Sequence, residues 1–83
     1  MIAWTKHAED RLNEWQRTLG ITREEVEQVL ADPEQVVPGD GEVLVAQARR
    51  GLGLLRVPFL SVEARKRVLT VYWTSKVEKY WRE

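Results

Sequence analysis

The chain has 83 residues, of which 43% are hydrophobic and 31% charged, with one histidine and no cysteine. At this length we expect residues 1–83 to form a single domain. Without cysteine there is neither a disulfide framework nor a thiol nucleophile, and a single histidine gives no usual zinc ligand set, so we expect no metal and no cofactor.

The formal net charge of zero conceals a division of the chain. Residues 1–41 carry four basic and nine acidic side chains, a net charge of −5, whereas residues 42–83 carry nine basic and four acidic, a net charge of +5. Such a separation bears on the choice of partners more than the total charge does. No stretch approaches the roughly 20 apolar residues that span a bilayer, so we expect a cytoplasmic protein with no membrane partner.

Two helices are predicted in the acidic part. Thr5 can cap a first helix, and Gly20 ends it. Thr22 and Glu25 form a capping box at the start of a second helix, which stops ahead of Asp32-Pro33. The apolar stripe of the first helix comprises Ala8, Leu12, Trp15 and Leu19, and the second helix buries Val26, Val29 and Leu30.

After Pro33 the apolar residues recur with period two, which is typical of strands. Glycine-rich and charged turns divide this part into strands over residues 42–50, 54–62 and 67–75. The alternation fixes the register of the last two strands, because a slip by one residue would turn every side chain over. The predicted pairs are Val57 with Val71, Leu55 with Trp73, Phe59 with Leu69, and Arg56 with Tyr72.

The expected fold is therefore α+β with two layers. Two N-terminal helices pack on one face of a mainly antiparallel sheet of three to four strands. Met1–Trp4 can add a short edge strand, which gives the order β-α-α-β-β-β.

Three polar residues of the first helix are candidates for chemistry. His7, Arg11 and Glu14 are spaced by four and three residues and so lie along one stripe. A histidine that titrates near neutrality beside an arginine that binds phosphate suits acid–base chemistry at a phosphodiester. The simpler interpretation, which we favour, is a solvated ion pair between Arg11 and Glu14 beside a half-buried His7.

A second group of candidates lies on the sheet face that is turned away from the helices. Arg56 and Tyr72 offer a guanidinium group and an aromatic ring that can hold a phosphate and an unstacked base. An ordinary pair on an exposed sheet face is an equally good interpretation, because cross-strand pairs of arginine and tyrosine are common without a function. The neighbouring basic residues that we assign to RNA binding are Arg65, Lys66, Arg67 and Lys76.

Tyr80 and Trp81 are adjacent large aromatic residues near the end of the sequence. They would form an exposed apolar patch unless they fold back onto the sheet or pack against another subunit. We expect them to fold back, with a dimer contact as the alternative, and we assign both as candidate partner-binding residues.

Short blocks spread over nearly the whole chain resemble a known family. They are Thr5-Lys6-His7-Ala8 with Arg11, Gly20-Ile21-Thr22, Glu24-Glu25-Val26, Asp32-Pro33, Leu55-Arg56-Val57 and Thr70-Val71-Tyr72-Trp73. Together they resemble the bacterial family catalogued as domain of unknown function 4258, which is similar to the RelE and ParE toxins. The resemblance implies the same strand and helix order and an endoribonuclease held inactive by an antitoxin. The residues that it would carry across as catalytic are His7, Arg11, Arg56 and Tyr72.

Two functions stay open from the sequence. In the first, a RelE-like domain binds or cleaves RNA without a metal ion, as the toxin of a toxin–antitoxin pair whose partners are RNA or the ribosome and an antitoxin. In the second, a non-catalytic module forms a homo-oligomer or binds a partner protein through its basic sheet face and its aromatic tail.

Overall fold

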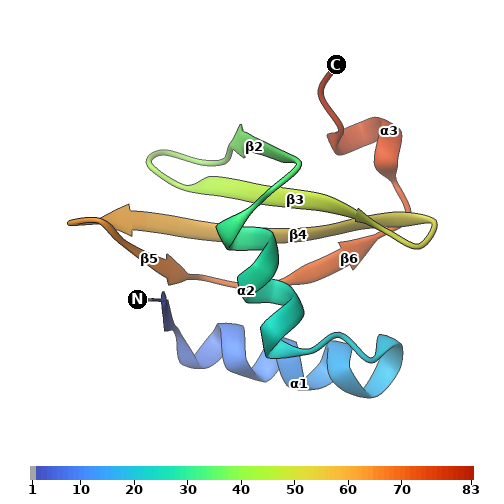
Figure 1. Ribbon diagram of the computed structural model, residues 1–83, viewed down its shortest axis with the longest axis horizontal. Helices are drawn as coiled ribbons and strands as arrows, with labels where there is room; N and C mark the ends of the chain where they lie inside the picture. Colours follow the sequence, from blue (N-terminus) through green and yellow to red (C-terminus); the bar gives the residue numbers. More distant parts are fainter. Residues whose placement is uncertain (1) are drawn as a thin grey trace.

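A computed structural model describes residues 2–83 (Figure 1). Two helices, α1 (Lys6–Leu19) and α2 (Arg23–Ala31), lie in the first half of the chain, and a short helix, α3 (Val77–Tyr80), lies near its end. The architecture is α+β, as the sequence predicts. The six strands of its sheet are β1 (Ile2–Trp4), β2 (Gln35–Pro38), β3 (Leu44–Arg50), β4 (Gly53–Val62), β5 (Arg65–Val68) and β6 (Tyr72–Thr74).

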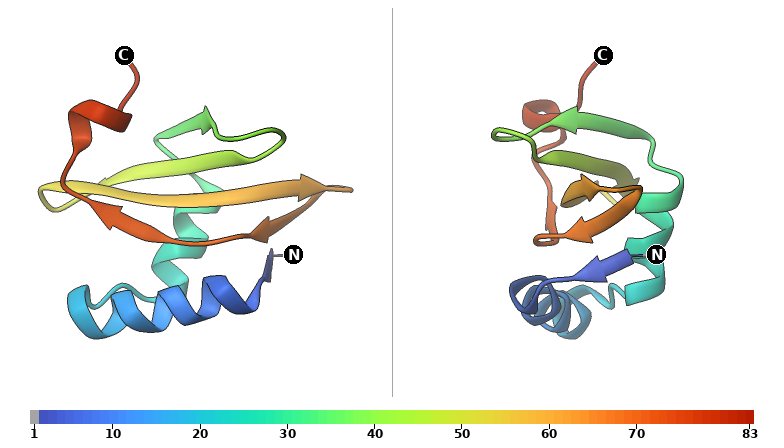
Figure 2. Two further views of the ribbon diagram at one scale, coloured as in Figure 1. Left: turned by 180° about the vertical axis from the view of Figure 1, so that it is seen from behind. Right: turned by 90° about the vertical axis from the view of Figure 1, so that its left-hand side faces the viewer.

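The sheet separates two sides of the molecule. α2 crosses β3 and β4 on one side, and α1 runs along the margin of the sheet beside β6 (Figure 1). α3 lies on the opposite side from α2 (Figure 2). We call the side covered by α2 the helix side, and the side on which α3 lies the outer face.

Both long helices begin and end at the predicted residues. Thr5 and Thr22 have extended backbones, and their hydroxyls accept hydrogen bonds from the amides of Ala8 (3.0 Å) and Glu25 (3.1 Å). Gly20 adopts a left-handed conformation, with φ at 70°, and donates its N–H back into the last turn of α1. Local sequence chemistry therefore sets the ends of α1 and the start of α2.

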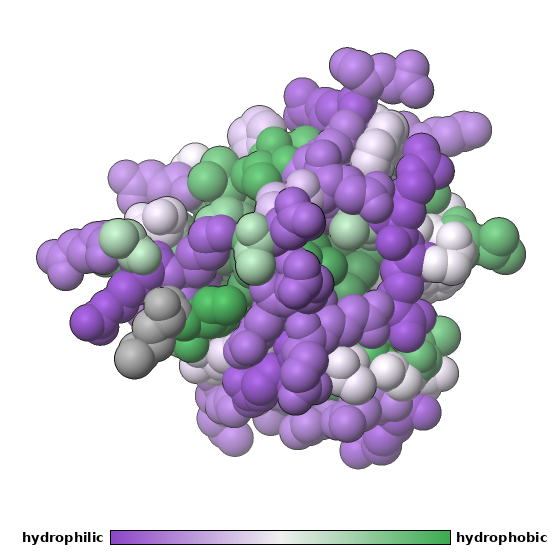
Figure 3. Space-filling model, viewed as in Figure 1, coloured by the Kyte–Doolittle hydropathy of each residue, from purple (hydrophilic) through white to green (hydrophobic). Residues whose placement is uncertain are grey.

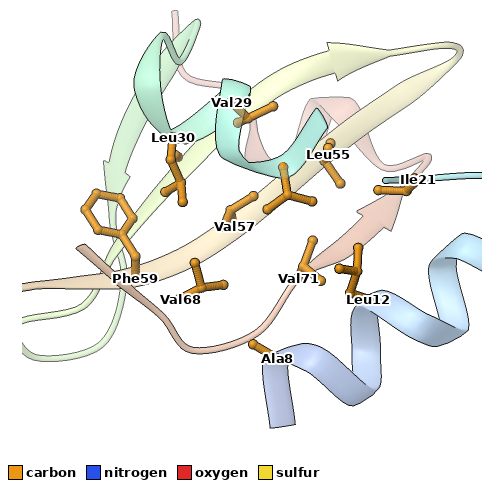
Figure 4. Close-up of a cluster of buried hydrophobic side chains, with 12 residues drawn as sticks. Ala8, Leu12, Ile21, Val29, Leu30, Leu55, Val57, Phe59, Val68 and Val71 are labelled. Atoms are coloured by element: carbon orange, nitrogen blue, oxygen red, sulfur yellow. The ribbon is translucent and has the colours of Figure 1, made fainter. Parts of the chain in front are cut away.

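The hydrophobic core lies between the helices and the sheet (Figure 4). Trp15 and Trp73 pack against it half-buried, and their indole N–H groups donate to backbone carbonyls of the sheet. Leu19, predicted to belong to the buried stripe, is 38% exposed, whereas Ile21, just after the helix, is fully buried in the core. The buried members of the core are Ala8, Leu12, Ile21, Val26, Val29, Leu30, Ala46, Leu55, Val57, Phe59, Val68 and Val71.

The sheet is mixed and larger than predicted. Its strand order is β1-β5-β4-β3-β2, and β6 pairs with β4 beside β5. β1 is parallel to β5, whereas the other pairs are antiparallel. The predicted number of three to four strands was wrong partly because β2 was missed. The apolar run of β2 is only Val36 and Val37, and Pro38 ends it, which an edge strand tolerates.

The predicted strand over residues 67–75 is two strands, β5 and β6. Phe59 pairs with Val68, so its predicted pairing with Leu69 is wrong. Between that pair and the first pair of β6, residues 57–58 of β4 face residues 69–71, which is the residue count of a β-bulge. The extra residue allows two side chains three positions apart, Val68 and Val71, to enter the core together. The predicted pairs Leu55 with Trp73 and Arg56 with Tyr72 are confirmed.

Trp73 lies against the first residue of β4. A Cβ atom on Gly53 would stand 2.1 Å from the carbonyl oxygen of Thr74 and 2.6 Å from Cζ2 of Trp73. Only glycine fits at this position, because the indole occupies the space of a side chain. Trp73 is thus turned toward the protein interior, as the alternation predicts.

Candidate functional site

A row of polar side chains crosses the outer face on four neighbouring strands. The register places Gln35 beside Gln47, Gln47 beside Arg56, and Arg56 beside Tyr72. Gln47 is fully buried and Arg56 is only 7% exposed, although glutamine and arginine are rarely buried in proteins. We call these four residues the polar row.

Hydrogen bonds connect the members of the polar row. Nε2 of Gln47 donates to Oε1 of Gln35 at 2.8 Å, and Nε of Arg56 donates to Oε1 of Gln47 at 2.8 Å. Nη1 of Arg56 donates to the hydroxyl of Tyr72. These bonds hold the guanidinium group of Arg56 in one orientation, because both neighbouring partners are themselves fixed in the sheet.

The end of the chain folds back over the polar row, as we expected for Tyr80 and Trp81. The carbonyl of Tyr80 accepts a hydrogen bond from Nε2 of Gln47 at 3.0 Å, and its ring centroid lies 4.0 Å from Cζ of Arg56. Further along, the amide of Arg82 donates to Oε1 of Gln35 at 3.1 Å. The sheet face that we expected to be open is therefore covered by α3 and the residues after it.

Ion pairs among the described residues involve the two long helices and the end of β3, and the surface on the side of α2 is largely hydrophilic (Figure 3). The pairs are Arg11 with Glu14 at 2.9 Å, Arg23 with Glu9 at 3.0 Å, and Arg50 with Glu25 at 2.5 Å. The last pair occupies the carboxylate of Glu25, so the predicted capping box keeps only its Thr22 half.

The basic side chains of the outer face form no ion pair with any described residue. We call four of them, Arg49, Arg56, Lys79 and Arg82, the outer cations. Arg49 instead lies over an aromatic ring, with Cζ 4.6 Å from the ring centroid of Trp81. The outer cations thus have no carboxylate of a described residue within ion-pair distance.

The structure does not bring His7 and Arg11 to Arg56 and Tyr72. Both belong to α1, which packs beside β6, and neither forms a hydrogen bond or an ion pair with Arg56 or Tyr72. The guanidinium group of Arg11 is engaged by Glu14, as in the simpler interpretation, and His7 is exposed rather than half-buried. The four residues suggested by the family resemblance therefore form two separate groups.

The basic residues around β5 also separate. Nζ of Lys66 donates to the carbonyl of Leu30 at 2.7 Å, which satisfies a free carbonyl at the end of α2 on the helix side. Arg65 and Arg67 are exposed and alternate with it along β5, so they lie toward the other side. Lys76 is exposed in the connection between β6 and α3.

A cavity of about 380 Å³ opens between β2, the turn after it and α3. Three of the outer cations, Arg56, Lys79 and Arg82, line it, and Asp40 supplies a carboxylate. Our sequence-based site assignments did not include Lys79, Arg82 or Asp40. Lys79 and Arg82 join Arg56 in this lining because α3 and the residues after it fold back over the sheet, and Asp40 joins them from the turn after β2. These are long-range contacts, which local sequence spacing does not predict.

Comparisons of the chain with protein-family models, with curated proteins and with solved structures found no match. None of the helices formed by residues 2–83 is both long and apolar enough to cross a membrane. Within the same residues, histidine and the acidic side chains form no cluster of three or more that could hold a metal ion. Function must therefore be argued from the geometry of the outer face.

Proposed function

We propose that this chain is a RelE-like RNA-binding domain that contacts RNA through its outer face. The observation that carries the proposal is the difference in pairing between the two sides. Arg11, Arg23 and Arg50, on or beside the two long helices, have carboxylate partners, whereas the outer cations have none among the described residues. Phosphate groups of RNA are suited to neutralise such cations, with release of counterions.

Aromatic rings among these cations support a single-stranded ligand. The rings of Tyr72 and Tyr80 lie edge to face, with centroids 6.4 Å apart, and Arg49 lies over Trp81. A basic surface with aromatic side chains holds single strands by combining phosphate contacts with base stacking. The resemblance to RelE-type toxins supports the same class of ligand and adds an antitoxin or the ribosome as proposed partners.

The proposal concerns binding, and cleavage is a separate question. His7 and Arg11, the candidate acid–base residues, lie on α1 and form no hydrogen bond or ion pair with the polar row. Cleavage at the outer face would therefore depend on residues such as Arg56 and Tyr72. Incubation of RNA with wild-type protein and with an Arg56→Ala, Tyr72→Ala double variant, with and without ribosomes, tests for it by the appearance of fragments that only the wild type produces.

Fluorescence anisotropy with a short labelled single-stranded RNA tests binding. For single strands, the logarithm of the affinity falls with the logarithm of the salt concentration by about 0.7 for each phosphate neutralised. Replacing both Arg49 and Lys76 with glutamine should therefore weaken binding and flatten this slope by about 1.4. Both residues lie outside the lining of the cavity, so the experiment addresses the open surface alone.

A matched control removes the same charge from the other side. Lys6 and Arg17 are exposed on α1 and form no ion pair with a described residue. A Lys6→Gln, Arg17→Gln double variant should retain the wild-type slope. Equal losses of RNA affinity in the two double variants would show that binding depends only on the net charge of the protein. The outer face would then not be the binding surface.

The separation of charge favours one other candidate, association between copies of this chain. An outer face without acidic partners can meet the acidic α1 and α2 of a second copy. Light scattering at low and high salt distinguishes the two functions. An oligomer that dissociates as salt rises supports self-association, and a monomer at every salt concentration rules it out.

A further inference from the structure

Arg56 carries a positive charge that the rest of the described chain does not neutralise. Arginine side chains are positively charged in proteins, and the hydrogen-bond partners of this one, Gln47 and Tyr72, are neutral. No carboxylate of a described residue lies within ion-pair distance of it. Burial of an arginine to 7% exposure without a counter-charge is costly, so a charge of the opposite sign is the missing element.

One end of the guanidinium group remains free. Nε and Nη1 donate to Gln47 and Tyr72, whereas Nη2 has no hydrogen bond with any described residue. Every buried side-chain nitrogen and oxygen among these residues does have a partner, so Nη2 must be accessible to solvent. Because Arg56 lines the 380 Å³ cavity, this is where its free donors can meet a ligand.

The cavity adds further charge and one apolar surface. Lys79 and Arg82 line it together with Arg56, and Asp40 is its one carboxylate, so the formal charge of the lining is +2. Tyr80 and Val45 supply apolar surface beside these cations. A pocket of this size, with a few convergent polar groups, is typical of sites for small organic ligands.

We propose that this cavity binds a phosphate monoester. A phosphate monoester carries close to two negative charges at neutral pH, which matches the lining, and its oxygens accept paired hydrogen bonds from a guanidinium group. The hydrogen bonds of the polar row hold Arg56 in place before the ligand arrives. The organic part of the ester lies against Tyr80 and Val45.

This chemistry has two sources, a phosphate at the end of an RNA chain and a free mononucleotide. Binding of the RNA end rests on the proposed function, whereas binding of a free nucleotide does not. The probes are therefore inorganic phosphate, AMP, adenosine, and RNA oligonucleotides of one sequence with a phosphate at neither end, at the 5′ end or at the 3′ end.

Titrations of the intact chain followed by amide chemical shifts locate and measure binding. We expect inorganic phosphate and AMP to shift residues 37–40 and 79–82 saturably, and adenosine to leave them unchanged. A Lys79→Gln, Arg82→Gln double variant should bind AMP at least about tenfold more weakly, because two charge-assisted contacts are lost. Both residues are exposed, so this variant should fold.

Controls keep the result specific to the cavity. The Lys6→Gln, Arg17→Gln double variant removes two charges from α1, outside the lining of the cavity, and should leave AMP affinity unchanged. Arg56→Gln, once its spectrum shows a folded protein, should abolish the shifts. Equal binding of adenosine and AMP, unchanged affinity in the Lys79→Gln, Arg82→Gln variant, or no saturable shift with phosphate or AMP would each overturn the proposal.

The RNA oligonucleotides separate this proposal from the proposed function. Tighter binding of an RNA with a terminal phosphate, by about tenfold, identifies the RNA end as the source of the phosphate. Equal binding of all three RNAs together with saturable AMP binding identifies a free nucleotide. If the protein binds RNA but neither AMP nor phosphate, the cavity proposal is overturned and the proposed function stands. If it binds AMP but not RNA, the cavity proposal stands and the proposed function is overturned.

Discussion

The two faces of β4 place neighbouring side chains in very different surroundings. Leu55 and Val57 point to the helix side, where apolar side chains from both long helices bury them. Arg56, between them, points to the outer face, where two neutral polar partners and a tyrosine ring surround its charge. The helix side is built for stability, whereas the outer face keeps a buried charge that stability alone does not require.

Adjacent arginines of β3 repeat this contrast. Arg50 reaches the helix side, where Nε donates to Glu25 and Nη2 donates to the carbonyl of Leu19 at 3.0 Å. Arg49 lies on the outer face over Trp81 and has no acidic partner among the described residues. We infer that charge on the helix side serves the fold, and charge on the outer face serves a ligand.

The largest effect should come from the apolar side of β4. Leu55→Ala removes a side chain that is 1% exposed and leaves a cavity in the core, so the free energy of unfolding should fall by about 2–5 kcal/mol. Urea denaturation measures it. Leu52→Ala, in the same hairpin at 92% exposure, is the control and should change stability by less than about 0.5 kcal/mol. Similar losses in both variants would contradict the assignment of the core.

An intermediate effect is expected in the polar row. Gln47→Leu leaves Nε of Arg56 without its acceptor in a buried site, which should cost about 1–3 kcal/mol. Adding Arg56→Met removes the stranded charge, and the double variant should recover at least about 1 kcal/mol of that loss. Unfolding of both single variants and the double variant completes the cycle. Additive losses would show that Gln47 and Arg56 are not coupled.

The smallest effect should separate the two arginines of β3. Arg50→Met removes one ion pair and one carbonyl contact, and should cost about 1 kcal/mol. Arg49→Met should stay within about 0.5 kcal/mol of wild type. Thermal unfolding in low and high salt provides the measurement, and salt should narrow the difference because it screens the ion pair. A larger loss of stability in Arg49→Met than in Arg50→Met would contradict the inference that charge on the helix side serves the fold.

The parts of the fold that were predicted from the sequence depend on neighbouring residues. Capping by Thr5 and Thr22 and the left-handed Gly20 are local features, and the structure reproduces them. The period of two also placed Arg56 opposite Tyr72 correctly. The bulge that shifts Leu69 away from Phe59 was not predicted, because a single extra residue leaves the alternation of each strand intact on both sides of it.

The candidate site was predicted only in part for a similar reason. Alternation places Arg56 and Gln47 on the outer face, but the sequence around them does not predict that they are buried there. Their burial comes from Tyr80, more than 20 residues later, whose carbonyl accepts from Gln47. The spacing of His7 and Arg11 correctly predicted that both lie on one helix. It could not predict where that helix would pack against the sheet.

The pairing of β1 with β5 has a consequence for how the chain reaches its structure. β1 can form its strand hydrogen bonds only after residues 65–68 are in place. Likewise, the hydroxyl of Thr5 donates to the carbonyl of Leu69, 64 residues later. Contacts between such distant parts of a chain slow folding, because a long loop must close before they form. During synthesis on the ribosome, residues 2–4 therefore stay without their strand partner until residues 65–68 have been made.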